Sequence, residues 1–200
     1  MHRYFLLHKP RNMVSQFVST HDVGLLGDLK FDFPEGTHAV GRLDLDSEGL
    51  LILTTDKRVT RLLFLAGKPH PRSYLVMVQN KVSEVTLALL REGIPIKIKN
   101  GEVYKATPVS VEIIPDPFIL YPYADDHRMT YPHTWLLITL IEGKYRQVRK
   151  MVLAARHRCL RLVRLNISNL QLGNLAPGEV MELNSETFYQ WLGIKPPDFP

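Results

Sequence analysis

The run Leu50–Thr54, with the sequence "LLILT", is continuously apolar over the length of a strand. A strand that is apolar on both faces needs cover on both sides of its sheet, so we expect this segment at the centre of a sheet. The segment "RYFLLHKP" predicts a second short strand, which Pro10 ends. A chain of 200 residues, 45% of them hydrophobic, can bury the core that such strands require.

Two short helices and a hairpin are predicted after this strand. One helix extends from Asp56, its N-cap, to Gly67, and another lies between Ser83 and Gly93. Isoleucines alternate with other residues from position 94, which indicates a strand. The pair Asn100-Gly101 then predicts a hairpin closed by a type I′ turn.

Two more helices are expected in the C-terminal half. The first extends from about Lys144 to His157, and its buried stripe comprises Val148, Met151, Val152 and Ala155. The second begins near Ser185 and directs Phe188, Trp191 and Leu192 inward. The segment Pro115–Pro132 lacks periodicity and is interpreted as a loop, either a mobile lid or a connection between subdomains. Hairpins and isolated helices without regular βαβ alternation predict an α+β fold, in one domain or two small subdomains.

The composition favours a cytosolic protein. The chain has no run close to the roughly 18 uncharged apolar residues of a membrane helix, and its N-terminus lacks a signal-peptide cleavage site. Its single cysteine, Cys159, permits no internal disulfide and is expected to be an inert buried thiol.

Positive charge is concentrated in one segment of the sequence. The net charge is +5, and the segment Glu142–Arg164 holds one acidic residue against eight basic ones. Such a cluster is typical of a surface that contacts phosphates, although a charge run by itself also fits a solvated helix face.

The stretch "GRLDLDSEGLLILTTD" places three carboxylates, Asp44, Asp46 and Glu48, on alternate positions. An EF-hand loop needs a bidentate glutamate at position 12, where this stretch has Thr55, so a calcium loop is excluded. A metal-dependent hydrolase that uses the three carboxylates remains an alternative. The eight histidines form no zinc pattern, and phosphate-binding glycine motifs and the "GxSxG" elbow are absent.

Three segments in this order, "GRLD", "RSYLV" and "EGKYRQVRKM", resemble the catalytic motifs of the RsuA-type pseudouridine synthases, which isomerise uridine within ribosomal RNA. The resemblance covers nearly the whole chain, residues 1–200, as one catalytic domain without the N-terminal S4-type RNA-binding domain that relatives commonly carry. It implies a mixed, mostly antiparallel sheet with flanking helices, cleft by the active site.

The resemblance also implies roles for five residues. Asp44 matches the essential catalytic aspartate, and Arg149 matches the basic residue that pairs with it. Tyr74 matches the tyrosine that stacks on the target base and is proposed to remove a proton. Leu162 matches the apolar residue beneath the pair, and Arg42 the arginine that helps to displace the target nucleotide.

The implied chemistry agrees with these residue types. A carboxylate can attack C1′ of the target, or stabilise a sugar cation while a proton leaves C2′, and no redox step calls for a cofactor or metal. Extruding the base costs about a few kcal/mol, which phosphate contacts can offset. The residues expected to make these contacts are Lys144, Arg146, Lys150 and Arg156. Asp46 and Glu48 are interpreted as turn and cap residues.

The expected partner is large-subunit (23S) ribosomal RNA, free or in an assembling subunit, bound by a monomer. The alternative is a non-catalytic RNA- or ribosome-binding module, which would not need Asp44, Tyr74 and Arg149 together. Two positions depart from the family pattern, because Asn12 and Ser168 stand where relatives have glycine. Asparagine tolerates a left-handed backbone, whereas serine leaves the geometry of the second turn open.

Overall fold

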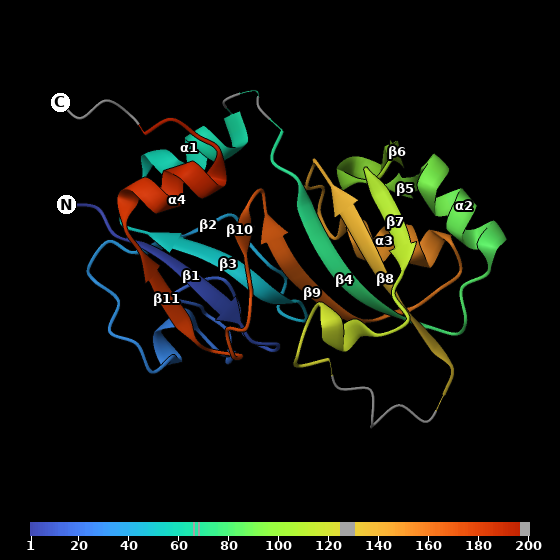
Figure 1. The fold of residues 1–200 in the computed structure, drawn as a ribbon, viewed down its shortest axis with the longest axis horizontal. Coiled ribbons are helices and arrows are strands. Elements are labelled where there is room, and N and C mark those ends of the chain that lie inside the picture. Colours follow the sequence, from blue (N-terminus) through green and yellow to red (C-terminus); the bar gives the residue numbers. More distant parts are fainter. Residues whose placement is uncertain (66, 68, 125–130, 197–200) are drawn as a thin grey trace. The chain divides into compact units, whose positions relative to one another are not determined.

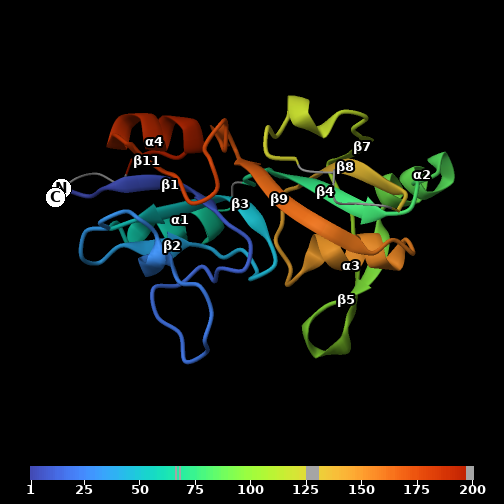
Figure 2. The same ribbon diagram turned by 90° about the horizontal axis from the view of Figure 1, so that it is seen from below.

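The structure is a computed structural model that describes residues 1–65, 67, 69–124 and 131–196. The chain divides into two compact units. Unit 1 comprises Met1–His70 with Asn166–Pro200, and unit 2 comprises Pro71–Leu165. Among the described residues, no helix has the length and apolar character needed to cross a membrane. Figure 1 labels the helices and strands, and Figure 2 gives the view from below.

Unit 1 is built around β3 (Glu48–Thr54), all of whose residues are buried. β3 pairs antiparallel with β1 (Tyr4–Lys9) and with β2 (His38–Val40), and β1 pairs antiparallel with β11 (Val180–Leu183). A short strand, β10 (Leu170–Gln171), pairs with the end of β9 (Cys159–Ile167). The prediction of a central, doubly covered strand at "LLILT" is therefore confirmed.

Two helices belong to unit 1, α1 (Arg58–Leu65) and α4 (Ser185–Leu192). The carboxylate of Asp56, ahead of α1, accepts hydrogen bonds from the hydroxyls of Tyr4 at 3.2 Å and Tyr189 at 3.0 Å. It also accepts from the main-chain N–H and the guanidinium of Arg58. The buried carboxylate thus caps α1, as the sequence predicts, and joins β1 to α4.

The inward face of α4 differs from the prediction at one position. Phe188 and Leu192 are buried, but Trp191 is 40% exposed, and Tyr189 is buried in its place. Residues 189 and 191 border the Phe188–Leu192 stripe on opposite sides, because successive residues of a helix are about 100° apart. The hydrogen bond between Tyr189 and Asp56 determines which border faces the core.

Unit 2 contains the strands in the order β9-β4-β8-β7, of which the β4–β8 and β8–β7 pairs are antiparallel. Of these strands, β4 is Arg72–Gln79, β7 is Ser110–Ile113 and β8 is His133–Leu140. Unit 2 also contains α2 (Glu84–Glu92), β5 (Ile94–Lys97), β6 (Val103–Ala106) and α3 (Gln147–Ala154). The predicted stripe of α3 is buried with residues of β4, β8 and β9 in one core. The two units together confirm the predicted α+β class with a mostly antiparallel sheet.

The β5–β6 hairpin is closed by a longer turn than the sequence predicts. A 3₁₀ turn occupies Lys99–Gly101, and the N–H of Ile98 donates to the carbonyl of Glu102 at 2.8 Å. Three residues therefore separate the bonded pair Ile98 and Glu102, whereas the loop of a type I′ hairpin has two. The hairpin prediction is confirmed and its turn type is wrong.

The described part of Pro115–Pro132, predicted as a mobile lid or a connection, is largely exposed but held to unit 2 at a few buried residues. Tyr121 and Ala124 are fully buried, and a 3₁₀ turn covers Pro117–Ile119. The guanidinium of Arg161 donates to the carbonyl of Tyr123 at 2.9 Å and lies 5.2 Å from the ring centre of Tyr121. Residues 125–130 of the predicted loop lie outside the described residues.

Asp56→Asn is expected to lower the free energy of unfolding at neutral pH by about 2 kcal/mol, because charge-assisted hydrogen bonds are lost in a buried site. Burial alone raises the pKa of Asp56, but hydrogen bonds from Arg58 and Tyr189 outweigh burial and hold the pKa far below its ordinary value. The stabilisation is therefore complete above the unfolded-state pKa of about 3.9 and disappears as the pH falls towards the folded-state pKa.

Denaturant unfolding measured between neutral pH and about pH 2 tests this expectation, with the exposed Asp22→Asn as the control. The difference in unfolding free energy between wild type and Asp56→Asn should shrink below about pH 4. A difference that is independent of pH would contradict the role of the ionised carboxylate.

Candidate active site

Leu43 anchors the "GRLD" segment in the core of unit 1. Its side chain is 7% exposed and packs in a cluster with Phe5, Leu7 and Leu51. The hydroxyl of Ser15 accepts a hydrogen bond from the N–H of Leu43 at 2.9 Å and donates one to its carbonyl at 3.0 Å. One buried hydroxyl thus satisfies both main-chain polar groups of the residue before Asp44, and Asp44 follows this fixed point directly.

A tight turn follows the anchor. The N–H of Ser47 donates to the carbonyl of Asp44 at 3.0 Å, and the N–H of Asn12 donates to the carbonyl of Leu45 at 2.8 Å. Asn12 has a φ of 63°, so asparagine does take the left-handed conformation at the position where relatives have glycine. The turn therefore survives this substitution, and Asp44 lies half-buried within it.

The residues before Asp44 are constrained by Gly41. Its φ is 76°, and an added Cβ would lie 2.9 Å from Cζ of Phe64 on α1. A side chain at this position would therefore be strained in the backbone and would require the ring of Phe64 to shift. Arg42, between Gly41 and the Leu43 anchor, is exposed.

The three alternating carboxylates do not form a metal cage. Within the described residues no group of three His, Cys, Asp or Glu side chains is arranged to hold a metal ion. Asp46 lies in the turn, as the sequence predicts, but Glu48 is the first residue of β3 and only 5% exposed. The interpretation of Glu48 as a turn or cap residue is wrong, because the strand begins two residues before the apolar run Leu50–Thr54.

Tyr74 lies on β4, opposite Ile138 of β8, and packs half-buried against the core of unit 2. The guanidinium of Arg164, on β9, is hydrogen-bonded to Tyr74. Burial lowers the pKa of Arg164, the partial negative charge of Tyr74 acts in the opposite direction, and the neighbouring Arg72 lowers it further. Sequence reasoning missed Arg164, although an arginine at a buried position of the apolar strand "LRLVRLNI" is a usable signal.

Arg149 lies on α3, next to the buried Val148. Its Nη1 is 3.4 Å from Sγ of the half-buried Cys159 at the start of β9. Leu162, three residues further along this strand, is 6% exposed and belongs to the core cluster on which Tyr74 packs. Tyr74, Arg149 and Leu162 are therefore carried by three elements around one core.

A partly buried polar network shapes the turn before α3. Nε2 of Gln147 donates to Glu142 at 2.6 Å, and Oε1 of Gln147 accepts from the N–H of Lys144 at 2.9 Å. The hydroxyl of Tyr104, on β6, donates to the same glutamate, which together with burial raises the pKa of this tyrosine. α3 starts at Gln147 rather than at Lys144, because the preceding residues form this turn.

Two of the four predicted RNA-binding residues have a left-handed backbone. Arg146, the N-cap of α3, has a φ of 52°, and Arg156, after its C-terminus, has a φ of 65°. The N–H of Arg156 donates to the carbonyl of Leu153 and that of His157 to Val152, the Schellman pattern in which glycine is the usual residue at the position of Arg156. A left-handed non-glycine residue costs about 1–2 kcal/mol, so arginine at these two positions has an unfavourable backbone conformation.

The predicted residues are distributed over both units. Arg42 and Asp44 belong to unit 1, and the others belong to unit 2. Lys144 and Arg156 are exposed, and Arg146 and Lys150 are half-buried. Ser168, the second departure, has a φ of 51° and a hydrogen bond of 2.9 Å between its hydroxyl and Nδ1 of His70. The pairing of Asp44 with Arg149 stays a prediction from the motifs.

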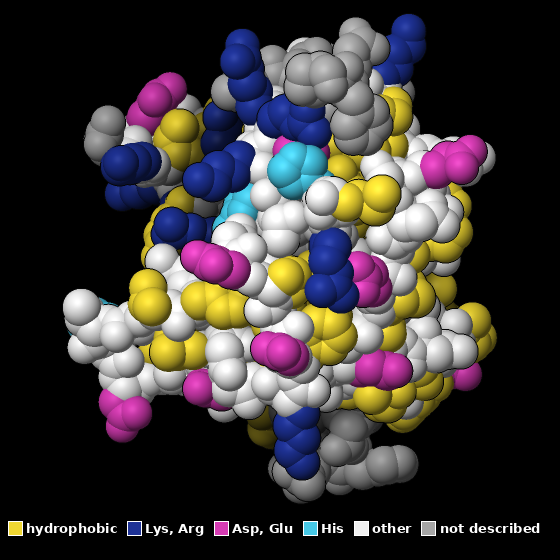
Figure 3. All heavy atoms as spheres, turned by 90° about the vertical axis from the view of Figure 1, so that its left-hand side faces the viewer, with side chains coloured by type: hydrophobic (Ala, Val, Ile, Leu, Met, Phe, Trp, Pro, Cys, Tyr) yellow, Lys and Arg dark blue, Asp and Glu magenta, His cyan; other side chains and the backbone are white. Residues whose placement is uncertain are grey.

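Charge is unevenly distributed on the molecular surface. On the face shown in Figure 3, most Lys and Arg side chains lie in the upper half, and most Asp and Glu side chains lie lower. Such a separation suits a polyanionic partner.

Comparison with known proteins identifies relatives over most of the chain. Residues 3–154 match the profile of the RNA pseudouridylate synthase family. A protein of Vibrio vulnificus named ribosomal large subunit pseudouridine synthase E is 36% identical over 183 residues, which are 91% of this chain and 75% of the relative. A protein of Xanthomonas axonopodis with the same name is 35% identical over 174 residues, 86% of this chain and 89% of the relative.

Solved structures show the same fold. The crystal structure of a pseudouridylate synthase has a TM-score of 0.75 at 28% identity and covers 96% of this chain and 74% of its own. Human RNA pseudouridylate synthase domain containing 1 has a TM-score of 0.54 at 15% identity over 98% of this chain, a likeness of fold alone. The mixed, mostly antiparallel sheet with flanking helices that the motif resemblance implies is therefore confirmed.

Ser15→Ala is expected to lower the free energy of unfolding by about 2 kcal/mol, because the N–H and carbonyl of Leu43 lose their partner in a buried site. Denaturant unfolding measures the effect. Ser19→Ala, at an exposed serine of the same loop, is the matched control and should change stability by less than about 0.5 kcal/mol. Equal stabilities of the two variants would show that the Leu43 anchor does not depend on Ser15.

Proposed function

We propose, from the premise that this chain belongs to the RNA pseudouridylate synthase family, that it isomerises one specific uridine of large-subunit ribosomal RNA to pseudouridine. The chain is an isomerase, and its relatives from Vibrio and Xanthomonas are named as synthases of the large ribosomal subunit. The observation that carries the proposal is the anchored turn that presents Asp44 directly after the buried Leu43.

The proposed reaction breaks the N1–C1′ bond of the target, turns the base and joins C5 to C1′. Asp44 serves either by attacking C1′, which gives a covalent sugar ester, or by stabilising the sugar cation while a proton leaves C2′. On the first route the ester bond breaks as C5 joins C1′, and on the second route C2′ regains its proton. The C5 proton is then removed and N1 gains a proton, so that product and substrate are isomers.

Arg149 is proposed to pair with Asp44 and keep it ionised, because a bonded guanidinium favours the charged form of a carboxylate. Tyr74 is proposed to stack on the extruded base and to accept the proton from C5. Its hydrogen bond with the buried Arg164 supports this placement, because the bond holds the hydroxyl end of the ring in one position. Arg42 is proposed to help displace the nucleotide, and Leu162 to support the pair from the core.

Phosphate contacts are proposed for Lys144, Arg146, Lys150 and Arg156, which offset the cost of extruding the base. The left-handed backbone of two of these residues supports the proposal, because glycine would be the more stable choice if the side chain had no role. We place the enzyme in the cytoplasm as a monomer acting on ribosomal RNA, free or within an assembling subunit.

Asp44→Asn is expected to reduce the rate of pseudouridine formation by more than about 10³-fold, because the amide cannot act as the nucleophile or balance a cation. Unmodified 23S rRNA is incubated with the purified variants and pseudouridine is mapped. Asp46→Asn, two residues along the same turn, removes the same charge and should stay within about tenfold of wild type. Full activity of Asp44→Asn would reject the mechanism, and no activity of the wild type would favour a binding module.

Arg156→Gly and Arg156→Ala separate backbone strain from side-chain function. Both should weaken binding to 23S rRNA, because both lose a phosphate contact. Both should also reduce the slope of log Kd against log salt concentration by about one. The glycine variant should be about 1 kcal/mol more stable than the alanine variant, because glycine relieves the left-handed strain. Undiminished RNA binding by both variants would remove Arg156 from the proposed interface.

A further inference from the structure

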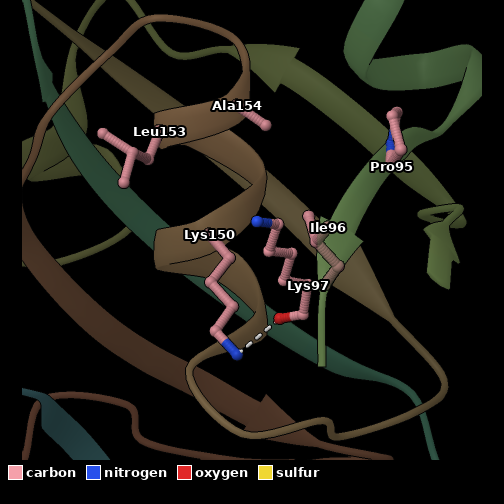
Figure 4. A pocket seen from close by; sticks show the side chains of 6 residues that line it. All are labelled: Pro95, Ile96, Lys97, Lys150, Leu153 and Ala154. Carbon is pink, nitrogen blue, oxygen red and sulfur yellow. Dashed lines mark hydrogen bonds between the residues drawn. The ribbon is translucent and has the colours of Figure 1, made fainter. Parts of the chain in front are cut away.

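An open cleft lies between α3 and β5 in unit 2, outside the residues to which the reaction assigns a catalytic role. Its volume is about 300 Å³, and it is lined by Pro95, Ile96, Lys97, Lys150, Leu153 and Ala154. Figure 4 shows these six side chains, and Figure 2 shows β5 beside α3. Ligand pockets begin at about this size.

The floor and one wall of the cleft are apolar. Leu153 is 67% exposed on the last turn of α3, and Pro95 and Ala154 are also exposed. Ile96 is buried and closes the bottom. An apolar surface of this kind offers one side of a planar base a contact that excludes water.

Cations border the same opening. The ammonium of Lys150 donates to the main-chain carbonyl of Lys97 at 2.8 Å and lies 5.3 Å from the ring centre of Tyr145, which is 70% exposed. These two contacts fix its position and use one of its three N–H donors. Within the described residues, neither Lys97 nor Lys150 has a carboxylate within ion-pair distance.

One residue that lines the cleft, Lys150, is adjacent in the sequence to Arg149 of the proposed reaction centre. Lys150 follows Arg149 directly, so their Cα atoms are about 3.8 Å apart. Their side chains diverge by about 100° around the helix axis, which directs one towards Cys159 and the other towards β5. Lys144 is five residues before Arg149, and its ammonium lies 5.1 Å from the ring centre of Tyr104 on β6, the strand paired with β5. A polyanion held near Arg149 therefore meets further positive charge along this side of α3.

We propose that the cleft binds one unpaired nucleotide of the ribosomal RNA that flanks the target uridine. The base rests on Leu153 and Pro95, and the phosphates contact Lys97 and Lys150. The charge favours a polyanion over a protein segment, and the small apolar floor beside the lysines suits a single base with its backbone. The inference rests on the proposed function and adds a second contact site to it.

Leu153→Asn and Lys97→Gln test the two halves of the cleft. Each has a matched control in unit 2 away from the cleft: Leu89→Asn, at a leucine that is 45% exposed on α2, and Lys81→Gln, at an exposed lysine. The Lys97 substitution retains the carbonyl that holds Lys150. The probes are unmodified 23S rRNA and a short single-stranded oligouridylate, and the measurements are Kd at several salt concentrations, kcat and KM.

Leu153→Asn should raise Kd about five- to tenfold without changing its salt dependence, because it removes a contact to a base. Lys97→Gln should raise Kd to a similar extent, because it removes a contact to a phosphate. It should also reduce the slope of log Kd against log salt concentration by about one. Both should raise KM and leave kcat at saturation unchanged, since the cleft does not contact the reacting atoms. When the RNA is shortened on one side of the target, the cleft variants and the wild type should have the same Kd and KM.

Cleft variants that bind RNA as tightly as their controls would overturn the inference while leaving the proposed reaction intact. An inactive wild type that still binds RNA through the cleft would overturn the reaction and retain the cleft. A fall in kcat at saturation with unchanged Kd would also overturn the inference, because the residues would then act at the reaction centre.

Discussion

The two hydrogen bonds between the Ser15 hydroxyl and the main chain of Leu43 fix the segment on which the proposed chemistry depends. A loop that carries a reactive carboxylate has to keep its backbone polar groups satisfied while its neighbours enter the core. Ser15 meets this requirement, and the Leu43 side chain adds an apolar anchor on the other side. Asp44 is therefore positioned by a residue buried immediately before it and a tight turn immediately after it, with β3 as the rigid element that follows.

In unit 2, side-chain hydrogen bonds likewise fix the backbone at the start of α3. The helix has no side-chain N-cap, and Gln147, Glu142 and Tyr104 arrange the turn before it instead. The left-handed arginines at the two ends of the helix fit the same view, because strain of this size persists only where the surrounding contacts determine the backbone. Arg149 lies between these two fixed ends, and its placement follows from them.

The positive charge of this region combines with apolar and aromatic surface. Lys144 and Lys150 each lie against a tyrosine ring, so the ammonium groups are held near surfaces that also suit bases. Cations of this kind supply affinity without sequence preference, whereas a base-sized cleft adds a requirement for an unpaired nucleotide at one distance from the target.

The sequence by itself determined the element types and the motif residues. Apolar continuity predicted the buried β3, the cap and stop residues predicted α1 and α2, and the order of three motifs identified the family that the comparisons confirm. The tertiary structure decided what depends on contacts between distant residues. Tyr189 rather than Trp191 faces inward because Asp56 bonds it, and Glu48 is buried because β3 starts early. Ser15 and the cleft beside α3 were beyond the sequence, since periodicity reports which face is apolar but not which polar groups meet there. Arg164 was missed although its position in an apolar strand is a usable signal.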